Sequence, residues 1–101
     1  MLPYFFAPEA EREFDEAFDY YERQLPGLGD RFLDNVTRTV ELICRMPTVA
    51  ACIFLDARRR SLNRFPYVVI YRVVNDTVQV ISVFHTSRNP DIWKSRVPAS
   101  E

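Results

Sequence analysis

The sequence has little of several residue types on which metal sites and disulfide frameworks depend. Its 101 residues include two cysteines, two glycines, one histidine and one tryptophan. Cys44 and Cys52, with a single histidine, cannot supply the clustered ligands of a structural metal site. Two cysteines also do not make a disulfide framework. We therefore expect two free thiols, no metal and no cofactor.

Long hydrophobic runs are also missing. No apolar stretch approaches the roughly 20 residues that cross a bilayer as a helix. The N-terminus lacks the basic leader and the small-residue cleavage site of a signal peptide. Hydrophobic residues make up 48% of the chain and charged residues 27%, as in an ordinary globular protein. We expect one domain over residues 1–101, cytoplasmic and without contact to a membrane.

Charge is unevenly distributed along the chain. Residues 1–50 contain ten acidic side chains and five arginines, whereas residues 51–101 contain four acidic and eight basic side chains. Twelve of the thirteen basic residues are arginine, whose planar guanidinium binds carboxylates, phosphates and aromatic faces. A basic C-terminal half suits either nucleic acid or an acidic protein segment, and charge alone does not distinguish them.

Residues 67–85 predict a β-hairpin. Two segments rich in β-branched and aromatic residues flank Asn75 and Asp76, the non-glycine residue types that best tolerate a positive φ. With these two residues as the turn, Ile70 lies opposite Ile81. One face of the hairpin is then largely apolar, and we expect it to pack against helices: Tyr67, Val69, Tyr71, Val73, Val78, Val80, Ser82 and Phe84. The opposite face mixes aliphatic residues with polar ones and is expected to be grooved, basic and partly open: Val68, Arg72, Gln79 and His85.

The preceding chain predicts a strand and two helices. Residues 2–6 are a short apolar run, and residues 8–24 carry an apolar stripe at helical spacing that begins with proline and acidic residues. Both glycines lie in residues 26–29, where they break the helix. A second apolar stripe runs from about Asp30 and is ended by Pro47. Because the connection is short, the two helices must form an antiparallel hairpin.

The remaining segments complete an α+β fold. Residues 48–57 are apolar without a clear period, and we interpret them as a connection. Residues 58–60 begin the first strand of a meander that the hairpin completes, and residues 86–96 form a polar tail. We therefore expect an N-terminal strand, an antiparallel two-helix hairpin and a three-stranded antiparallel meander (β-α-α-β-β-β), with a short C-terminal tail and the helices on one face of the sheet.

This order of elements and its motifs resemble the RelE/ParE superfamily of type II toxin–antitoxin toxins, most closely its ParE-like branch. The resemblance covers almost the whole chain, and members of this one fold either poison DNA gyrase or cleave mRNA on the ribosome, so the fold does not settle the function. It is carried by Pro8-Glu9-Ala10, Tyr20-Tyr21-Glu22, Pro26-Gly27-Leu28-Gly29 with Arg31-Phe32, Arg59-Arg60, Arg64-Phe65-Pro66-Tyr67 and Val83-Phe84-His85, followed by Arg88, Pro90 and Trp93.

The resemblance implies a ParD-like antitoxin as the partner, in an even-numbered hetero-oligomer. Its C-terminal segment would fold on the toxin as an amphipathic helix beside the two-helix hairpin, with acidic residues on the arginines of the sheet. We expect Arg59 and Arg60 within this footprint. The full set of antitoxin-binding candidates is Arg58, Arg59, Arg60, Tyr20 and Arg72.

DNA gyrase is the expected target. A gyrase inhibitor needs a surface rather than an acid–base pair, and arginine beside tryptophan is typical of interface anchors. The candidates for target binding are Arg88, Trp93, Lys94 and Arg96. A third possibility is a non-toxic relative that only binds an antitoxin.

A ribosome-dependent endoribonuclease is the alternative. Cleavage through the 2′-hydroxyl needs a base, an acid and cations, for which His85, Arg72 and Arg88 are the candidates, with Trp93 as a stacking platform. The RelE-type nucleases usually carry a basic residue directly after the aromatic residue that opens the third strand. Here that position is Val68, which favours binding over cleavage.

Each candidate also has a structural interpretation. His85 can hydrogen-bond near the strand end and hold the tail. Trp93 can dock the tail onto the sheet. Arg72 can pair with a carboxylate such as Asp76, and the arginines of residues 58–60 can protect an edge strand from pairing with another chain.

Overall fold

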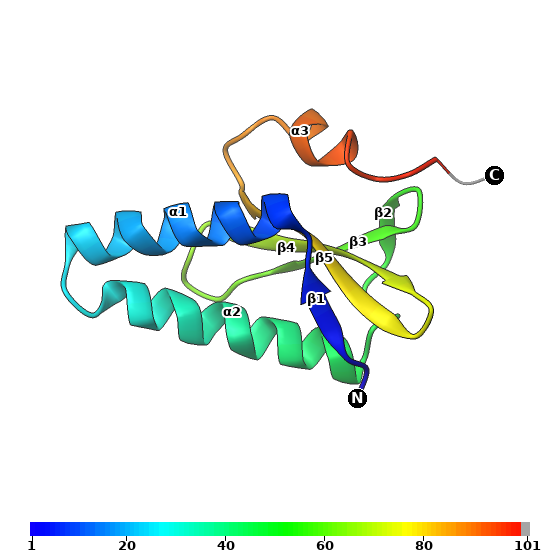
Figure 1. The fold of residues 1–101 in the computed structure, drawn as a ribbon, viewed down its shortest axis with the longest axis horizontal. Coiled ribbons are helices and arrows are strands. Elements are labelled where there is room, and N and C mark those ends of the chain that lie inside the picture. The colour runs from blue at the N-terminus through cyan, green and yellow to red at the C-terminus, as the bar shows by residue number, and fades with distance from the viewer. Residues whose placement is uncertain (100–101) are drawn as a thin grey trace.

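The computed structural model describes residues 1–99 as the expected α+β fold (Figure 1). The elements are β1 (Tyr4–Phe6), α1 (Pro8–Gln24), α2 (Leu28–Arg45), β2 (Cys52–Phe54), β3 (Ala57–Ser61), β4 (Tyr67–Val74), β5 (Thr77–His85) and α3 (Asp91–Lys94). One sheet contains all of these strands in the order β1-β5-β4-β3-β2. β1 is parallel to β5, and the other neighbours are antiparallel. No helix within residues 1–99 is both long and apolar enough to cross a bilayer.

The turn between α1 and α2 depends on its glycines. Gly27 has a φ of 90°, a left-handed conformation that glycine adopts without strain. A Cβ atom added to Gly29 would lie 2.8 Å from Glu22 Oε1. The Glu22 carboxylate accepts the backbone N–H groups of both glycines at 3.0 Å. These bonds satisfy donors at the start of α2, which begins at Leu28, earlier than the expected Asp30.

α1 and α2 cover one side of the sheet, called here the helix face (Figure 1). The main core lies between these two helices and the sheet. The Tyr71 side chain is 1% exposed, and its hydroxyl donates to the Pro47 carbonyl at 2.9 Å. Burial raises the pKa of this phenol. The buried residues of this core are Ala10, Ala17, Phe32, Val36, Val40, Ile43, Cys44, Leu62, Val69, Tyr71, Val78, Val80 and Val83.

A β-bulge in the β4–β5 hairpin changes the predicted register. Arg72 and Gln79 are partners, as the turn at Asn75 and Asp76 predicts, but Ile70 pairs with Ser82 rather than with Ile81. Ile81 is the additional residue of the bulge. The predicted Ile70–Ile81 pair is therefore wrong. Apolar residues occupy successive positions of β5, so their alternation cannot reveal where one residue is skipped.

The bulge also changes which β5 side chains meet the helices. Val83 joins the core of the helix face, opposite Val69. Phe84 was predicted on that face, but it lies opposite Val68 in a second core on the other side of the sheet. His85 pairs with Tyr67, whose ring packs against the helices. His85 therefore lies on the helix face, not on the face predicted for it.

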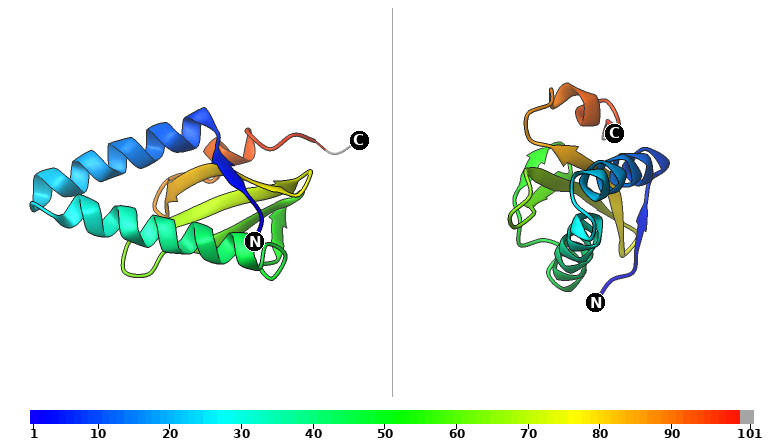
Figure 2. Two further views of the ribbon diagram at one scale, coloured as in Figure 1. Left: turned by 60° about the horizontal axis from the view of Figure 1, so that its bottom comes forward. Right: turned by 90° about the vertical axis from the view of Figure 1, so that its left-hand side faces the viewer.

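The C-terminal tail covers the other side of the sheet, called here the tail face. Figure 2 shows α3 and the α1–α2 hairpin on opposite sides of the strands. Trp93 is 4% exposed there, and the second core consists of Ala57, Val68, Ile70, Ile81, Phe84, Trp93 and Val97. The expectation of an open, grooved and basic face is therefore wrong at the centre of the sheet, because residues 91–97 fill it with apolar side chains.

A single carboxylate ties the tail to α1 and β5. The Arg96 guanidinium donates to both Glu13 oxygens, at 3.0 and 3.1 Å. The Ser82 hydroxyl at 2.7 Å and the Val83 backbone N–H at 3.2 Å also donate to Glu13. The Glu13 side chain is only 10% exposed, and hydrogen bonds of this kind offset the cost of removing its charge from water.

The connection predicted for residues 48–57 contains a strand, so this prediction is wrong in part. β2 pairs antiparallel with β3 through a register irregularity. The turn between the two strands places Leu55 at a φ of 53°, although leucine gives no turn signal. Ile53 and Leu55 are 43% and 48% exposed. Apolar residues of this segment are thus exposed as well as buried. The sequence therefore lacks the alternation of apolar and polar residues by which a strand is recognised.

Replacing the tryptophan of the tail tests this packing. Trp93→Ala should lower the free energy of unfolding by about 3–5 kcal/mol, because the cavity left under α3 cannot fully collapse. Chemical denaturation at neutral pH measures it. Val49→Ala, at a position that is 68% exposed, is the control and should change stability by less than about 0.5 kcal/mol. A loss below about 1 kcal/mol for Trp93→Ala would show that the tail is not docked.

Candidate functional surfaces

His85 and Arg88 border a small hollow of about 220 Å³ at the end of β5, next to α1. The His85 ring packs edge-on against Tyr67 with centroids 5.0 Å apart. Its Nδ1 atom accepts the backbone N–H of Ser87 at 3.1 Å. Tyr20, which is 55% exposed, also lines this hollow. The structure therefore brings together three predicted site residues that come from different candidate sets.

Arg72 lies on the tail face, where it pairs with the carboxylate of Asp56 in the turn between β2 and β3. Its Nε and Nη2 atoms donate to the two oxygens of Asp56 at 3.0 and 2.8 Å, and Nη1 approaches Gln79 at 3.4 Å. The pairing expected with Asp76 is replaced by one with Asp56. The hydrogen bond from Arg72 lowers the pKa of Asp56. His85 and Arg72, both candidates for nuclease chemistry, are thus on opposite faces of the sheet.

The residues predicted to bind the target have different environments. Arg88 is exposed, with its guanidinium 5.8 Å from the centroid of the Phe84 ring. Lys94 is half-buried, with Nζ 5.5 Å from the Phe54 ring. Trp93 is buried in the second core, and Arg96 is paired with Glu13. Of the four, Arg88 and Lys94 are therefore the ones that offer charge to a partner.

The residues predicted to bind an antitoxin do not form one surface. Arg58 and Arg60 pair with residues whose side chains point to the helix face, so Arg59 between them points to the tail face. Arg58 donates to the Thr48 carbonyl at 3.2 Å and to the Ala50 carbonyl, which fixes the connection before β2. A single segment that touched all of these arginines would have to cross the β2–β3 edge of the sheet.

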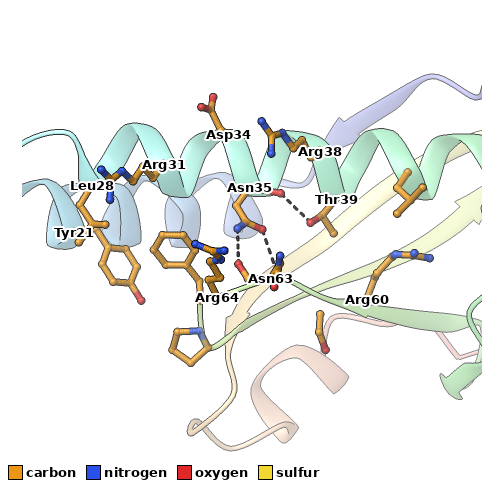
Figure 3. Close-up of a pocket in the computed structure, with 14 residues that line it drawn as sticks. Tyr21, Leu28, Arg31, Asp34, Asn35, Arg38, Thr39, Arg60, Asn63 and Arg64 are labelled. Carbon is orange, nitrogen blue, oxygen red and sulfur yellow. Dashed lines mark hydrogen bonds between the residues drawn. The ribbon is translucent and has the colours of Figure 1, made fainter.

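A larger hollow, of about 970 Å³, lies between α2 and the chain from β3 to β4 (Figure 3). We call it the arginine groove, because it is lined by Arg31 and Arg38 of α2, Arg60 of β3 and Arg64 of the β3–β4 loop. Among residues 1–99, Asp34 is the one acidic residue of its lining. Sequence reasoning selected only Arg60 for a function. Arg31 and Arg38 stand seven positions apart, which places both on one side of a helix, and this spacing could have found them.

A reciprocal pair of amide hydrogen bonds joins α2 to the β3–β4 loop in the arginine groove. The Asn35 side-chain Nδ2 donates to the Asn63 carbonyl, and the Asn63 backbone N–H donates to Asn35 Oδ1 at 3.2 Å (Figure 3). The next residue, Arg64, has a φ of 72°, an unfavourable conformation for a residue with a long side chain. Such a conformation persists where the surrounding contacts enforce it. The contacts of the loop therefore hold the Arg64 backbone in this conformation.

A second hollow of about 440 Å³ lies outside the helix pair, next to β1. Its lining is largely apolar and includes Phe14, Leu33 and Val36, while Glu11 and Asp15 lie beside them. Leu33 of α2 is 40% exposed at this hollow. This hollow thus has the opposite charge to the arginine groove.

The chain is similar to known toxins. Residues 4–90 match the family model of the ParE toxin of type II toxin–antitoxin system, parDE. Toxin ParE2 of two Mycobacterium tuberculosis strains is 30% identical over 91 residues, covering 86% of this chain and 84% of the relative. A solved structure of the chromosomal ParDE system from P. aeruginosa superposes with a TM-score of 0.64 at 19% identity, covering 86% of this chain and 98% of that one, which supports the fold.

The Arg72–Asp56 pair gives a pH-dependent contribution to stability. Asp56 has a folded pKa below its ordinary value of 3.8. Its contribution is therefore complete above the unfolded pKa and is lost as the pH falls through the folded pKa. Asp56→Asn should destabilise the protein at neutral pH by at most about 1 kcal/mol, since the pair is partly exposed.

Denaturation of the wild type and of Asp56→Asn at neutral and acid pH measures this. The difference in stability should shrink as the pH falls below the ordinary pKa of 3.8 and through the lower folded pKa of Asp56. Asp76→Asn, which removes a carboxylate from the β4–β5 turn, is the control. A difference between wild type and Asp56→Asn that stays constant down to acid pH would contradict the pairing.

Proposed function

Because this chain belongs to the ParE toxin family of type II toxin–antitoxin systems, we propose that its target is DNA gyrase and that a ParD-like antitoxin neutralises it. The toxin would act in the cytoplasm by binding, without covalent chemistry. With its antitoxin it would form an even-numbered hetero-oligomer, in which the C-terminal segment of the antitoxin folds on the toxin surface.

The separation of His85 and Arg72 is the observation that carries the gyrase proposal. Cleavage of RNA needs an acid, a base and cations around one phosphate. His85 is on the helix face, whereas Arg72 is on the tail face and is paired with Asp56. Val68, where the nucleases of the superfamily usually carry a basic residue, is 3% exposed in the core under the tail. No cation at that position would reach a substrate while the tail is docked.

The exposed end of the molecule near Arg88 and Lys94 is the surface proposed to contact gyrase. Both cations belong to the segment after β5, and both lie over aromatic rings. Trp93 would act indirectly, since it is buried and orients α3. Arg96 would also act indirectly, through its pair with Glu13. These contacts hold the tail on the sheet, and a segment that is already held in place loses less conformational entropy when it binds.

A ribosome-dependent nuclease remains the second candidate, and one observation favours it. His85 and Arg88 share a hollow with Tyr20 and Tyr67, so a titratable ring and a cation lie close together. A non-toxic relative that only binds an antitoxin is the third candidate. These alternatives differ from a gyrase inhibitor in whether His85 is needed and in whether the free protein is toxic.

Assays with the purified toxin separate the candidates. Wild type and His85→Ala should inhibit gyrase supercoiling at the same concentration and leave mRNA on translating ribosomes intact. The double variant Arg88→Glu/Lys94→Glu should need at least about tenfold more protein for half-inhibition, because it replaces the two cations of the proposed contact surface.

The matched control is Arg12→Glu/Arg23→Glu, which changes the net charge equally on the exposed side of α1. Cleavage of mRNA that disappears in His85→Ala, with supercoiling unaffected, would overturn the gyrase proposal in favour of the nuclease. A toxin without either activity would favour the antitoxin-binding relative.

A further inference from the structure

The hollow of about 440 Å³ beside β1, called here the β1 hollow, has a floor that belongs to the main core. Val36 and Val40 of α2 line it and are buried. Phe14 of α1 also lines it, and its ring stacks on Phe32 with centroids 5.6 Å apart. Packing of the fold therefore fixes the shape of the hollow before a partner arrives.

The rim of the β1 hollow exposes large apolar side chains. Tyr4 and Leu33 line it, and Tyr4 is 48% exposed. Phe5, next to Tyr4 in β1, is 49% exposed. Exposed apolar side chains that gather beside a hollow mark an interaction surface, and tyrosine is enriched among the residues that anchor partners.

The charge at the β1 hollow restricts what can occupy it. Glu11 and Asp15 line the hollow and stand four positions apart, which places both on one side of α1. Within residues 1–99 the ion pairs are Arg72–Asp56 and Arg96–Glu13, so neither of these two carboxylates has a cationic partner there.

These carboxylates disfavour two of the available partners. The acidic antitoxin segment that the resemblance implies would be repelled here. A second copy of the chain would also be repelled, because a two-fold contact brings the same carboxylates together. A basic segment with apolar side chains matches both the floor and the rim.

α1 separates the β1 hollow from the surface proposed to contact gyrase. Glu16 and Tyr20 line the hollow that contains Arg88, whereas Glu11 and Asp15 line the β1 hollow. A helix with its side chains is about 10–12 Å across. One partner can therefore reach both sides of α1 at once.

We propose that the β1 hollow is a second contact surface for the target and takes a basic segment of DNA gyrase. The apolar side chains of this segment lie on Tyr4 and Leu33, and its lysine or arginine side chains pair with Glu11 and Asp15. The proposal rests on the proposed function for the identity of the partner. A target held at both sides of α1 has to match a cationic and an anionic surface together, which adds specificity.

Charge reversal on α1 tests the surface. Glu11→Lys/Asp15→Lys should raise the toxin concentration for half-inhibition of gyrase supercoiling by at least about tenfold, because like charges then face each other. Glu11→Gln/Asp15→Asn removes charge without adding repulsion and should raise it by about threefold or more. Asp19→Lys/Glu41→Lys, at exposed positions outside the hollow, is the matched control and should stay within about twofold. Unfolding curves establish that each variant is folded.

A separate variant tests the apolar part of the surface without a change in charge. Leu33→Ala should raise the half-inhibition concentration by about fivefold, because it removes an exposed apolar contact. Leu25→Ala, at a position that is 53% exposed and outside the hollow, should leave the concentration unchanged.

A designed amphipathic peptide of lysine and leucine probes the hollow without gyrase, and the same peptide with glutamate in place of lysine is its control. The lysine peptide should shift the amide resonances of Leu33 and Thr37 in the isotope-labelled toxin, and the glutamate peptide should not. These shifts in a toxin that fails to inhibit supercoiling would refute gyrase as the target and retain the hollow as a site for basic segments.

Two results would overturn the surface and keep gyrase as the target. One is inhibition by Glu11→Lys/Asp15→Lys at the wild-type concentration, or an equal loss in the Asp19→Lys/Glu41→Lys control. The other is a loss of affinity for the purified antitoxin in Glu11→Lys/Asp15→Lys while inhibition of gyrase is unchanged, which would assign the hollow to the antitoxin.

Discussion

The β-bulge at Ile81 decides which side of the sheet each functional side chain occupies. Because one residue of β5 is skipped, Val83 and His85 turn to the helix face, while Phe84 turns to the tail face. The apolar surface thus created on the tail face is what Trp93 covers. Without the bulge, His85 would lie on the same side of the sheet as Arg72. The bulge therefore separates the residues from which a nuclease site would be built.

The sequence predicted the elements well and the contacts between distant segments poorly. α1 has the expected bounds, because Pro8 and the acidic first turn mark its start. The β4–β5 turn at Asn75 and Asp76 was also predicted, since both residues tolerate a positive φ. The bulge, β2 and the packing of the tail were missed. Each depends on pairing or burial between segments, which local propensity does not encode.

For the candidate site residues too, the sequence did not predict the contacts between distant segments. Arginine content predicted a cationic surface, but not which arginines have partners inside the fold. Arg72 is held by Asp56 and Arg96 by Glu13, and both acids come from segments remote in sequence. The arginine groove is likewise assembled from α2, β3 and a loop. A helical spacing of seven could have singled out Arg31 and Arg38, but only the fold shows that Arg60 and Arg64 line the same groove.

The register of the β4–β5 hairpin is the measurement that tests this account most directly. Nuclear Overhauser contacts between backbone protons of opposing strands report the pairs in solution. The account predicts contacts of Ile70 with Ser82 and of Val68 with Phe84. Contacts of Ile70 with Ile81 would instead show an unbulged hairpin. They would return His85 to the side of Arg72 and contradict the separation on which the binding mechanism rests.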